Sequence, residues 1–230
     1  MFLENNIWFP PINIIYHFKR LEKSGELIPG TNSYKKATEA YITAVLLIGL
    51  TEILNKDFWL QIVNDKEQSP DIRTGCYHKL TRDNDFSYQD VEVVTYEQHS
   101  KENLIDFICN TKLSKQKAYD DLTTILCHIN KIFLIPSWID LNQALLKKKL
   151  KTKSPVMIIG KSHPEKEIYK IIQIYPTIDL RIEFDLLNEC KKNKSRGVLK
   201  MKKSANGALH FERHPDEKIY PFQNLITKRE

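Results

Sequence analysis

Apolar positions along the chain recur at helical spacing in its first part, and they predict two helices there. The stretch 11–24 begins at a proline and ends before Gly25, as a helix often does, and its expected buried stripe is Ile12, Ile15, Phe18 or Lys19, and Leu21. After the turn at 28–30, Ser33 is the predicted N-cap of a second helix, whose apolar positions are Ala37, Ala40, Tyr41, Ala44, Val45 and Ile48.

The most apolar run, 44–50, lies inside this second helix. It has acidic residues on both sides, Glu39 and Glu52. A bilayer needs roughly 20 apolar residues in a row, so this run predicts a buried helix and not a membrane span.

Strand-like segments follow the second helix. The pattern predicts strands at 58–63, 71–77 and 88–96, then a helix capped by Ser100 with Leu104, Ile105 and Ile108 facing inward, then a buried strand at 123–129. The predicted order is therefore helix, three strands, helix, strand. It indicates an α/β (α+β) fold with a mixed sheet flanked by helices.

Beyond Pro136 the pattern becomes mostly β. Ser137 is the predicted cap of a helix that reaches about residue 150, and strands are predicted at 156–160, 168–175, 180–184, 198–201 and 208–211. No Gly/Ser/Pro linker separates the two parts. We therefore expect a helical N-terminus and core over 1–146, with a basic β-rich extension over 147–230 packed on that core.

Carboxylates gather on the predicted strands. Asp71 follows Pro70 at the start of one strand, and Asp90 and Glu92 lie two positions apart on the next, so that they point to the same face. Burying two acids on one face is costly without a cation or hydrogen-bond donors. Carboxylate oxygens are ligands that Mg²⁺ prefers, and the expected metal ligands are Asp71, Asp90 and Glu92.

These residues and the element order resemble the PD-(D/E)XK superfamily of nucleases, which includes many restriction endonucleases. The resemblance covers roughly 31–136, with Pro70-Asp71 as the first half of the motif. In one register Glu92 is the second acid and Val94 stands where the family carries lysine. In the other, favoured because it leaves a complete ligand set, Asp90 is the second acid and Glu92 replaces the lysine.

The resemblance also implies roles for residues outside the motif. Glu39 lies where the family tends to carry a glutamate on its first helix, and an exposed helix glutamate is the alternative. Arg73, two residues after Asp71 on the same face, is expected to contact a phosphate. The implied cofactor is Mg²⁺ or Mn²⁺.

Positive charge is concentrated in the second part of the chain. The whole chain carries a net charge of +6, and 147–203 holds 16 Lys and Arg against 6 Asp and Glu. This balance suits a surface that binds nucleic acid, with Lys191, Lys192, Lys194 and Arg196 as expected contacts. The alternative is a lysine-rich surface that only solubilises the protein.

Cysteines and histidines give weaker indications. Cys76, Cys109, Cys127 and Cys190 show no C-x-x-C pairing and no secretion signal is evident, which favours free thiols and a cytoplasmic location. His128, between apolar neighbours, is expected to be a core residue. His78 and His99 flank the acidic strands, and His210 and His214 flank a predicted strand.

Taken together, the residues favour a metal-dependent nuclease whose expected substrate is duplex DNA rather than RNA, without a membrane partner and with a homodimer left open. Two alternatives remain at this point. One is an inactive nuclease-like module that binds nucleic acid, because Val94 replaces the lysine in one register. The other is an intracellular interaction or defence-system protein with no nucleic-acid role.

Overall fold

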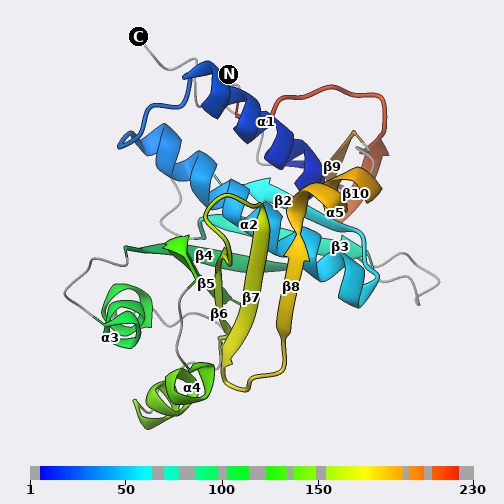
Figure 1. Cartoon of the computed structure of the whole chain (residues 1–230). Helices are drawn as coiled ribbons and strands as arrows, with labels where there is room; N and C mark the ends of the chain where they lie inside the picture. The colour runs from blue at the N-terminus through cyan, green and yellow to red at the C-terminus, as the bar shows by residue number, and fades with distance from the viewer. Residues whose placement is uncertain are drawn as a thin grey trace. The chain divides into compact units, whose positions relative to one another are not determined.

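The computed structural model describes most of the 230-residue chain. The described residues are 6–63, 70–77, 86–97, 103–113, 123–133, 137–148, 154–193, 197–204 and 209–222. They contain both helices and strands, and the fold is a mixed α+β fold (Figure 1). This confirms the predicted fold class.

The helices are α1 (Pro11–Ser24), α2 (Asn32–Leu54), α3 (Leu104–Ile108), which continues into a π-helical turn η1 (Cys109–Leu113), α4 (Trp138–Lys147) and α5 (Leu186–Lys192). The strands are β1 (Ile7–Trp8), β2 (Phe58–Ile62), β3 (Ile72–Tyr77), β4 (Phe86–Glu97), β5 (Thr124–Ile132), β6 (Val156–Lys161), β7 (Ile168–Tyr175), β8 (Arg181–Asp185), β9 (Val198–Lys203) and β10 (Leu209–His214). The predicted order from α2 to β5 is confirmed, whereas α5 was not predicted.

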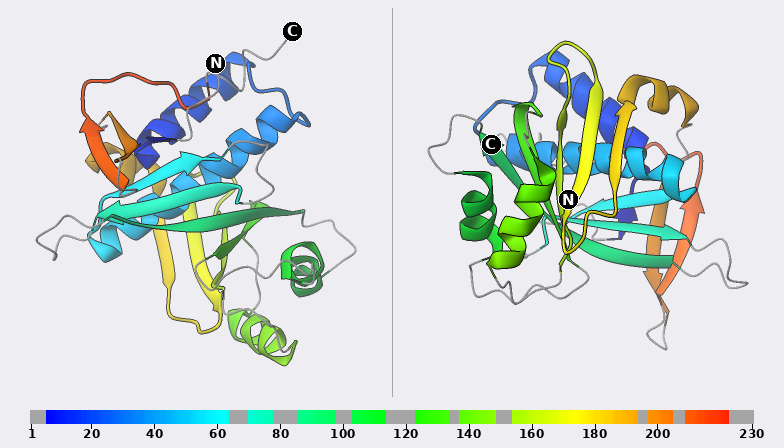
Figure 2. Two further views of the ribbon diagram at one scale, coloured as in Figure 1. Left: turned by 180° about the vertical axis from the view of Figure 1, so that it is seen from behind. Right: turned by 60° about the horizontal axis from the view of Figure 1, so that its bottom comes forward.

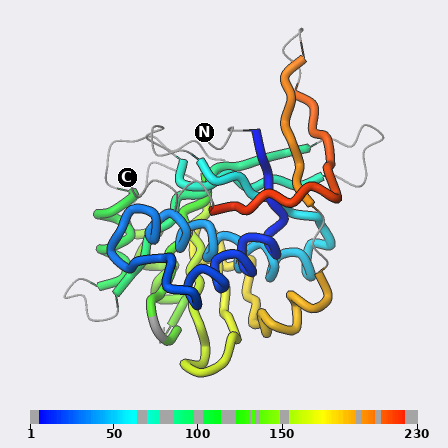
Figure 3. The backbone as a smooth tube through the Cα atoms, turned by 90° about the horizontal axis from the view of Figure 1, so that it is seen from above, coloured from blue at the N-terminus to red at the C-terminus, as the bar shows by residue number. Residues whose placement is uncertain are grey.

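The strands form two sheets. The larger sheet has the strand order β2-β3-β4-β5-β6-β7-β8, with β4, β5 and β6 parallel and β6, β7 and β8 antiparallel. The smaller sheet has the order β1-β9-β10 and is antiparallel. Figure 3 shows β9 and β10 in orange running side by side.

The chain packs into two compact units. Unit 1 comprises Met1–Tyr88 and Cys190–Glu230, and unit 2 comprises Gln89–Glu189. The predicted domain boundary at 146 and 147 falls inside unit 2, where β6 of the basic segment pairs in parallel with β5 of the predicted core. The basic segment and the core thus share a sheet.

In unit 1, helices α1 and α2 pack against each other and against β2 (Figures 1 and 2). Helix α1 begins at Pro11 and ends at Gly25, whose φ of 72° provides the left-handed C-cap. Its predicted buried stripe is confirmed, with Phe18 buried rather than Lys19. The N-cap of α2 is Thr31, which accepts a hydrogen bond from the Tyr34 amide at 3.1 Å, so the prediction of Ser33 was wrong.

Helix α2 is buried along most of its length. By length and composition alone it is apolar enough to cross a membrane, but 72% of its most apolar window is buried inside the fold. Core helices pass the same test, so this finding does not identify a membrane span. Its burial agrees with the prediction of a buried helix around 44–50.

In unit 2, one face of the strands β4 to β7 packs on α3, η1 and α4. The buried residues of this face, which we call the helix-covered face, include Val94, Ile125, Cys127, Ile158 and Ile172 from the strands and Ile105, Ile108, Cys109 and Leu145 from the helices. Ser137 caps α4, as predicted, and accepts from the Asp140 amide at 3.2 Å. Ser100 lies outside the described residues.

Candidate functional site

The first candidate site lies on β4, at the end of unit 2 where β5 begins. The parallel register places Glu92 beside Ile125 and Val94 beside Cys127, two residues of the helix-covered face. Because side chains alternate along a strand, Asp90 belongs to the same face as Glu92. Glu92 thus lies on the helix-covered face, and the alternation of side chains along β4 assigns Asp90 to that face as well.

Glu92 is buried, and its charge is matched by a lysine from the turn that follows α3. The Lys112 ammonium donates to the Glu92 carboxylate, and the two side chains are 17% and 6% exposed. A buried carboxylate is costly unless it is paired and hydrogen-bonded. Lys112 therefore places an ammonium group on this face, next to the Glu92 carboxylate.

Sequence reasoning missed Lys112 because it lies 20 residues after Glu92. Its signal in the sequence is a lysine four residues after the last residue of a short amphipathic helix, and in the structure it lies in η1. That signal carries no indication of which strand residue the lysine would reach. The pairing is set by the packing of α3 and η1 on the strands.

The other predicted carboxylates belong to unit 1. Asp71 is half-buried just before β3, and Arg73 is half-buried on that strand opposite Gln61. Since Asp90 and Glu92 belong to unit 2, the convergence of the three acids stays a prediction.

Glu39 lies on α2 and is 6% exposed, so the alternative of an exposed helix glutamate was wrong. The Lys35 ammonium lies 3.8 Å from a Glu39 carboxylate oxygen, one helical turn away. Glu39 is in unit 1, like Asp71. Its carboxylate thus lies near a cation on the exposed surface of the same helix.

The donor chemistry of β4 fits a hard divalent cation in part. Across the described ranges of the chain, no three His, Cys, Asp or Glu side chains gather closely enough to form a metal-binding group. Mg²⁺, however, is usually held by one or two carboxylates together with waters and substrate phosphates. Asp90 and Glu92 are the two carboxylates of this strand face that would hold such an ion.

The predicted phosphate-contacting cations are described only in part. Lys191 and Lys192 are exposed on α5, and the Lys192 ammonium lies 3.8 Å from Glu52. Lys194 and Arg196 lie outside the described residues. Other lysines of 147–203 form ion pairs, namely Lys148 with Asp106, Lys161 with Glu167, Lys170 with Glu183, Lys200 with Glu217 and Lys202 with Glu212. Acidic neighbours therefore offset part of the positive charge of this stretch.

The histidines singled out in the sequence that the structure describes, His128, His210 and His214, belong to no metal-binding group there. His128 lies on β5, and burial lowers its pKa to about 4 although the nearby Glu97 raises it. Its ring is therefore neutral at pH 7, although the residue as a whole is half-buried and not part of the buried core. His214 lies 3.6 Å from Glu217 and 3.7 Å from Glu212, while His78 and His99 lie outside the described residues.

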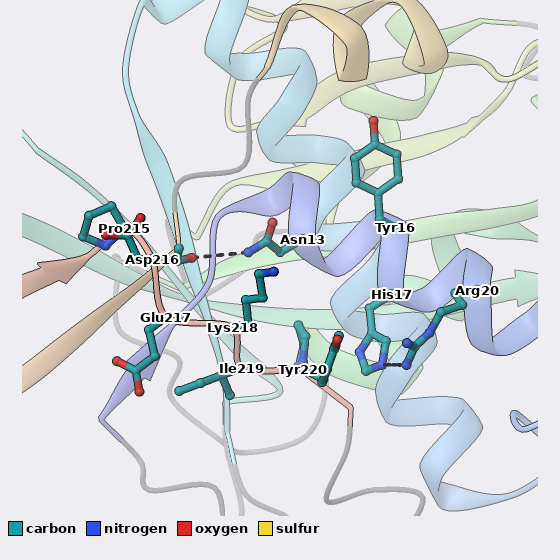
Figure 4. A pocket seen from close by; sticks show the side chains of 12 residues that line it. Asn13, Tyr16, His17, Arg20, Pro215, Asp216, Glu217, Lys218, Ile219 and Tyr220 are labelled. Carbon is teal, nitrogen blue, oxygen red and sulfur yellow. Dashed lines mark hydrogen bonds between the residues drawn. The ribbon is translucent and has the colours of Figure 1, made fainter.

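A second candidate site is a pocket in unit 1 that the sequence did not indicate. Its volume is about 530 Å³, and it is formed by α1 and the segment after β10 (Figure 4). Its lining residues include Asn13, Tyr16, His17 and Arg20 from α1 and residues 215–221. A volume of this size is typical of small-molecule sites.

His17 forms the buried base of this pocket. Its Nδ1 accepts from the Phe222 amide at 3.2 Å, its Nε2 lies 2.8 Å from an Arg20 guanidinium nitrogen, and its ring stacks on Phe222. Burial, and then the positive charge of Arg20, lower the pKa of His17 to about 4, while Glu26 raises it. The imidazole is therefore neutral at pH 7.

Comparisons of this chain with protein-family models, with curated proteins and with solved structures found no match.

Proposed function

We propose that this protein is a metal-dependent nuclease whose reacting groups include Asp90, Glu92 and Lys112. The observation that carries the proposal is the buried ion pair between Glu92 and Lys112 on the face of β4 that also bears Asp90. The order of elements from α2 to β5 agrees with the resemblance seen in the sequence. The substrate expected from the charge of the chain is duplex DNA.

The pair favours chemistry over a purely structural role because an apolar pair would suit this face better. The neighbours of Glu92 on the helix-covered face are aliphatic, Ile125 beside it and Val94 after it. Replacing a buried ion pair by apolar residues of similar volume is often neutral or stabilising. A carboxylate and an ammonium at this place thus carry a cost that a catalytic role would explain.

Each side chain has a separate task in the proposed reaction. The carboxylates of Asp90 and Glu92 would hold the cation and accept hydrogen bonds from water. The Lys112 ammonium would donate to a phosphate oxygen or orient the attacking water, which is the task of the lysine in the family motif. When bound, Mg²⁺ or Mn²⁺ would supply Lewis-acid stabilisation of the phosphate and lower the pKa of a bound water.

The test is cleavage of supercoiled plasmid and of linear duplex DNA with Mg²⁺, with Mn²⁺ and with EDTA. We expect cleavage only with the metals, and a loss of about 10²-fold or more in Asp90→Asn, Glu92→Gln and Lys112→Met. Glu97→Gln is the matched control, because Glu97 lies on β4 but on the opposite face, where it accepts from Asn130 at 2.8 Å.

Further measurements test the predicted ligands in unit 1 and the alternative functions. Asp71→Asn and Glu39→Gln test the ligands expected from the sequence, which should also lose activity while keeping the wild-type melting temperature. Cleavage by Lys112→Met at the wild-type rate would remove Lys112 from the mechanism. If the wild-type protein cleaves neither DNA nor RNA but binds DNA, the inactive binding module becomes the better explanation.

A further inference from the structure

The pocket in unit 1 has its own chemistry, which is independent of the proposed nuclease function. Its base is the ring of His17, which is 6% exposed, and one wall is the segment 215–221 after β10. Figure 4 shows the His17 and Arg20 side chains directed toward each other from α1. The protons on the facing nitrogen atoms of these two side chains decide which kind of ligand atom can hydrogen-bond beside them.

The tautomer of His17 follows from its bond to the backbone. A backbone amide can only donate, so Nδ1 of His17 must accept from the Phe222 amide and carries no proton. The neutral ring then carries its proton on Nε2. A protonated ring would lose the Phe222 bond, which agrees with a pKa of about 4.

Nε2 of His17 therefore carries an N–H donor, and the Arg20 nitrogen next to it is also a donor. The Arg20 guanidinium nitrogen lies 2.8 Å from His17 Nε2, and a guanidinium has no acceptor atom. Two N–H groups thus point at each other and cannot hydrogen-bond together. An oxygen atom placed beside both would accept from both at once.

Arg20 is held in place by an aromatic ring. Its guanidinium carbon lies 4.9 Å from the centroid of Tyr220, within the range of a cation–π contact. Tyr220 in turn lies 5.3 Å from the His17 ring. These contacts orient the guanidinium before any ligand arrives, which lowers the entropy that binding would cost.

The other charges of the pocket leave a small positive excess. Lys218 is an exposed cation of the lining and Asp216 an exposed anion, whereas Glu217 is ion-paired with the Lys200 ammonium at 2.7 Å. The negative charge of Asp216 therefore offsets the positive charge of one of the two cations, Arg20 and Lys218. One positive charge remains to attract a ligand. A neutral donor and a cation next to each other are a typical site for an oxyanion.

We propose that this pocket binds a small organic oxyanion, whose phosphate or carboxylate oxygen accepts from His17 Nε2 and from the Arg20 guanidinium. The volume of about 530 Å³ exceeds what a bare anion needs and leaves space for an organic group beside Tyr16 and Ile219. The oxyanion resolves the contact between the two donors.

The experiment titrates the full chain with inorganic phosphate, adenosine 5′-monophosphate and benzoate, with adenosine as the probe that lacks the oxyanion. Nitrogen-15 NMR of labelled histidine follows His17, and calorimetry gives the affinity. We expect a ligand-free spectrum of the Nε2-protonated tautomer, a shift of Nε2 on adding at least one of the three anions, and no shift with adenosine. The anions that bind show whether phosphate, carboxylate or either is accepted.

Arg20→Gln is the decisive variant, because Arg20 is exposed and its loss should leave the fold intact. We expect it to weaken binding by about tenfold or more, as the loss of a charge-assisted hydrogen bond does. Lys23→Gln is the matched control, because Lys23 is an exposed cation of α1 that does not line the pocket. Equal weakening by both variants would mean diffuse attraction and overturn the proposal. So would a His17 Nε2 signal that none of the three anions moves.

Discussion

The backbone amide of Phe222 donates to Nδ1 of His17 at 3.2 Å, and the two residues are 205 positions apart in the sequence. This bond connects the segment after β10 to α1. His17 also stacks on Phe222, so a single imidazole contacts two parts of unit 1 that are far apart in the sequence, α1 and the segment after β10.

The first prediction concerns the pH dependence of stability. The pKa of His17 is lowered from its ordinary 6.5 to about 4 in the folded protein, chiefly by burial. The unfolded chain therefore binds more protons between these values, and stability should fall as the pH drops from about 6.5 towards 4. The loss at the acid end is on the order of 3 kcal/mol.

Urea denaturation of the wild type and of His17→Gln at pH 7 and at pH 4.5 measures this effect. Glutamine offers an acceptor for the Phe222 amide but does not titrate. The variant should lose less stability on acidification than the wild type, although His128, whose pKa is also about 4, leaves part of the dependence in both. Parallel losses in the two proteins would show that His17 titrates normally.

The second prediction concerns the Glu92–Lys112 pair. Lys112→Met leaves the buried Glu92 carboxylate without its cation, so this variant should lose about 3 kcal/mol of unfolding free energy. The double variant Glu92→Leu/Lys112→Met places apolar groups on an apolar face and should recover most of that loss. Chemical denaturation at pH 7 of the wild type, both single variants and the double variant gives the coupling energy between the two side chains. A stable but inactive double variant is the expected result, and additive losses would contradict the pairing.

The third prediction compares two glycines with positive φ. Gly197 has φ of +74°, and a Cβ there would lie 2.0 Å from the His214 carbonyl oxygen, whereas Gly30 has φ of +86° with open space around it. Gly30→Ala should cost about 1 kcal/mol for the left-handed backbone alone. Gly197→Ala should cost clearly more, since backbone atoms must move as well. Thermal unfolding compares the two, and equal costs would contradict the close approach.

The fourth prediction concerns DNA binding through the basic segment. If Lys191 contacts phosphate, Lys191→Glu should weaken binding to all sequences alike and reduce the slope of log affinity against log salt by about 0.9. Lys23→Glu is the matched control, because both lysines are exposed on helices. The triple variant Lys191→Glu/Lys192→Glu/Lys194→Glu extends the test to the whole cluster. Slopes that match the wild type would identify these lysines as a solvated surface.

Hydrophobic periodicity determined much of the fold, because it depends on spacing within one segment. The period of 3.6 placed α1 between Pro11 and Gly25, and the run of apolar and β-branched residues placed β5 and β7. The period of two also put Asp90 and Glu92 on one face. The N-cap of α2 at Thr31 was missed because Ser33 has a side-chain hydroxyl that can cap a helix in the same way. Which of the two residues caps α2 depends on where the preceding turn ends.

Tertiary structure alone decided the partners. Nothing near Glu92 in the sequence points to Lys112, and nothing near His17 points to Phe222, since each contact forms only when distant segments pack together. The burial of Glu39 has the same origin, because an isolated helix exposes every side chain. A sequence pattern records which face a residue occupies, whereas the charge, donor or ring that meets it there is set by the packing of the chain.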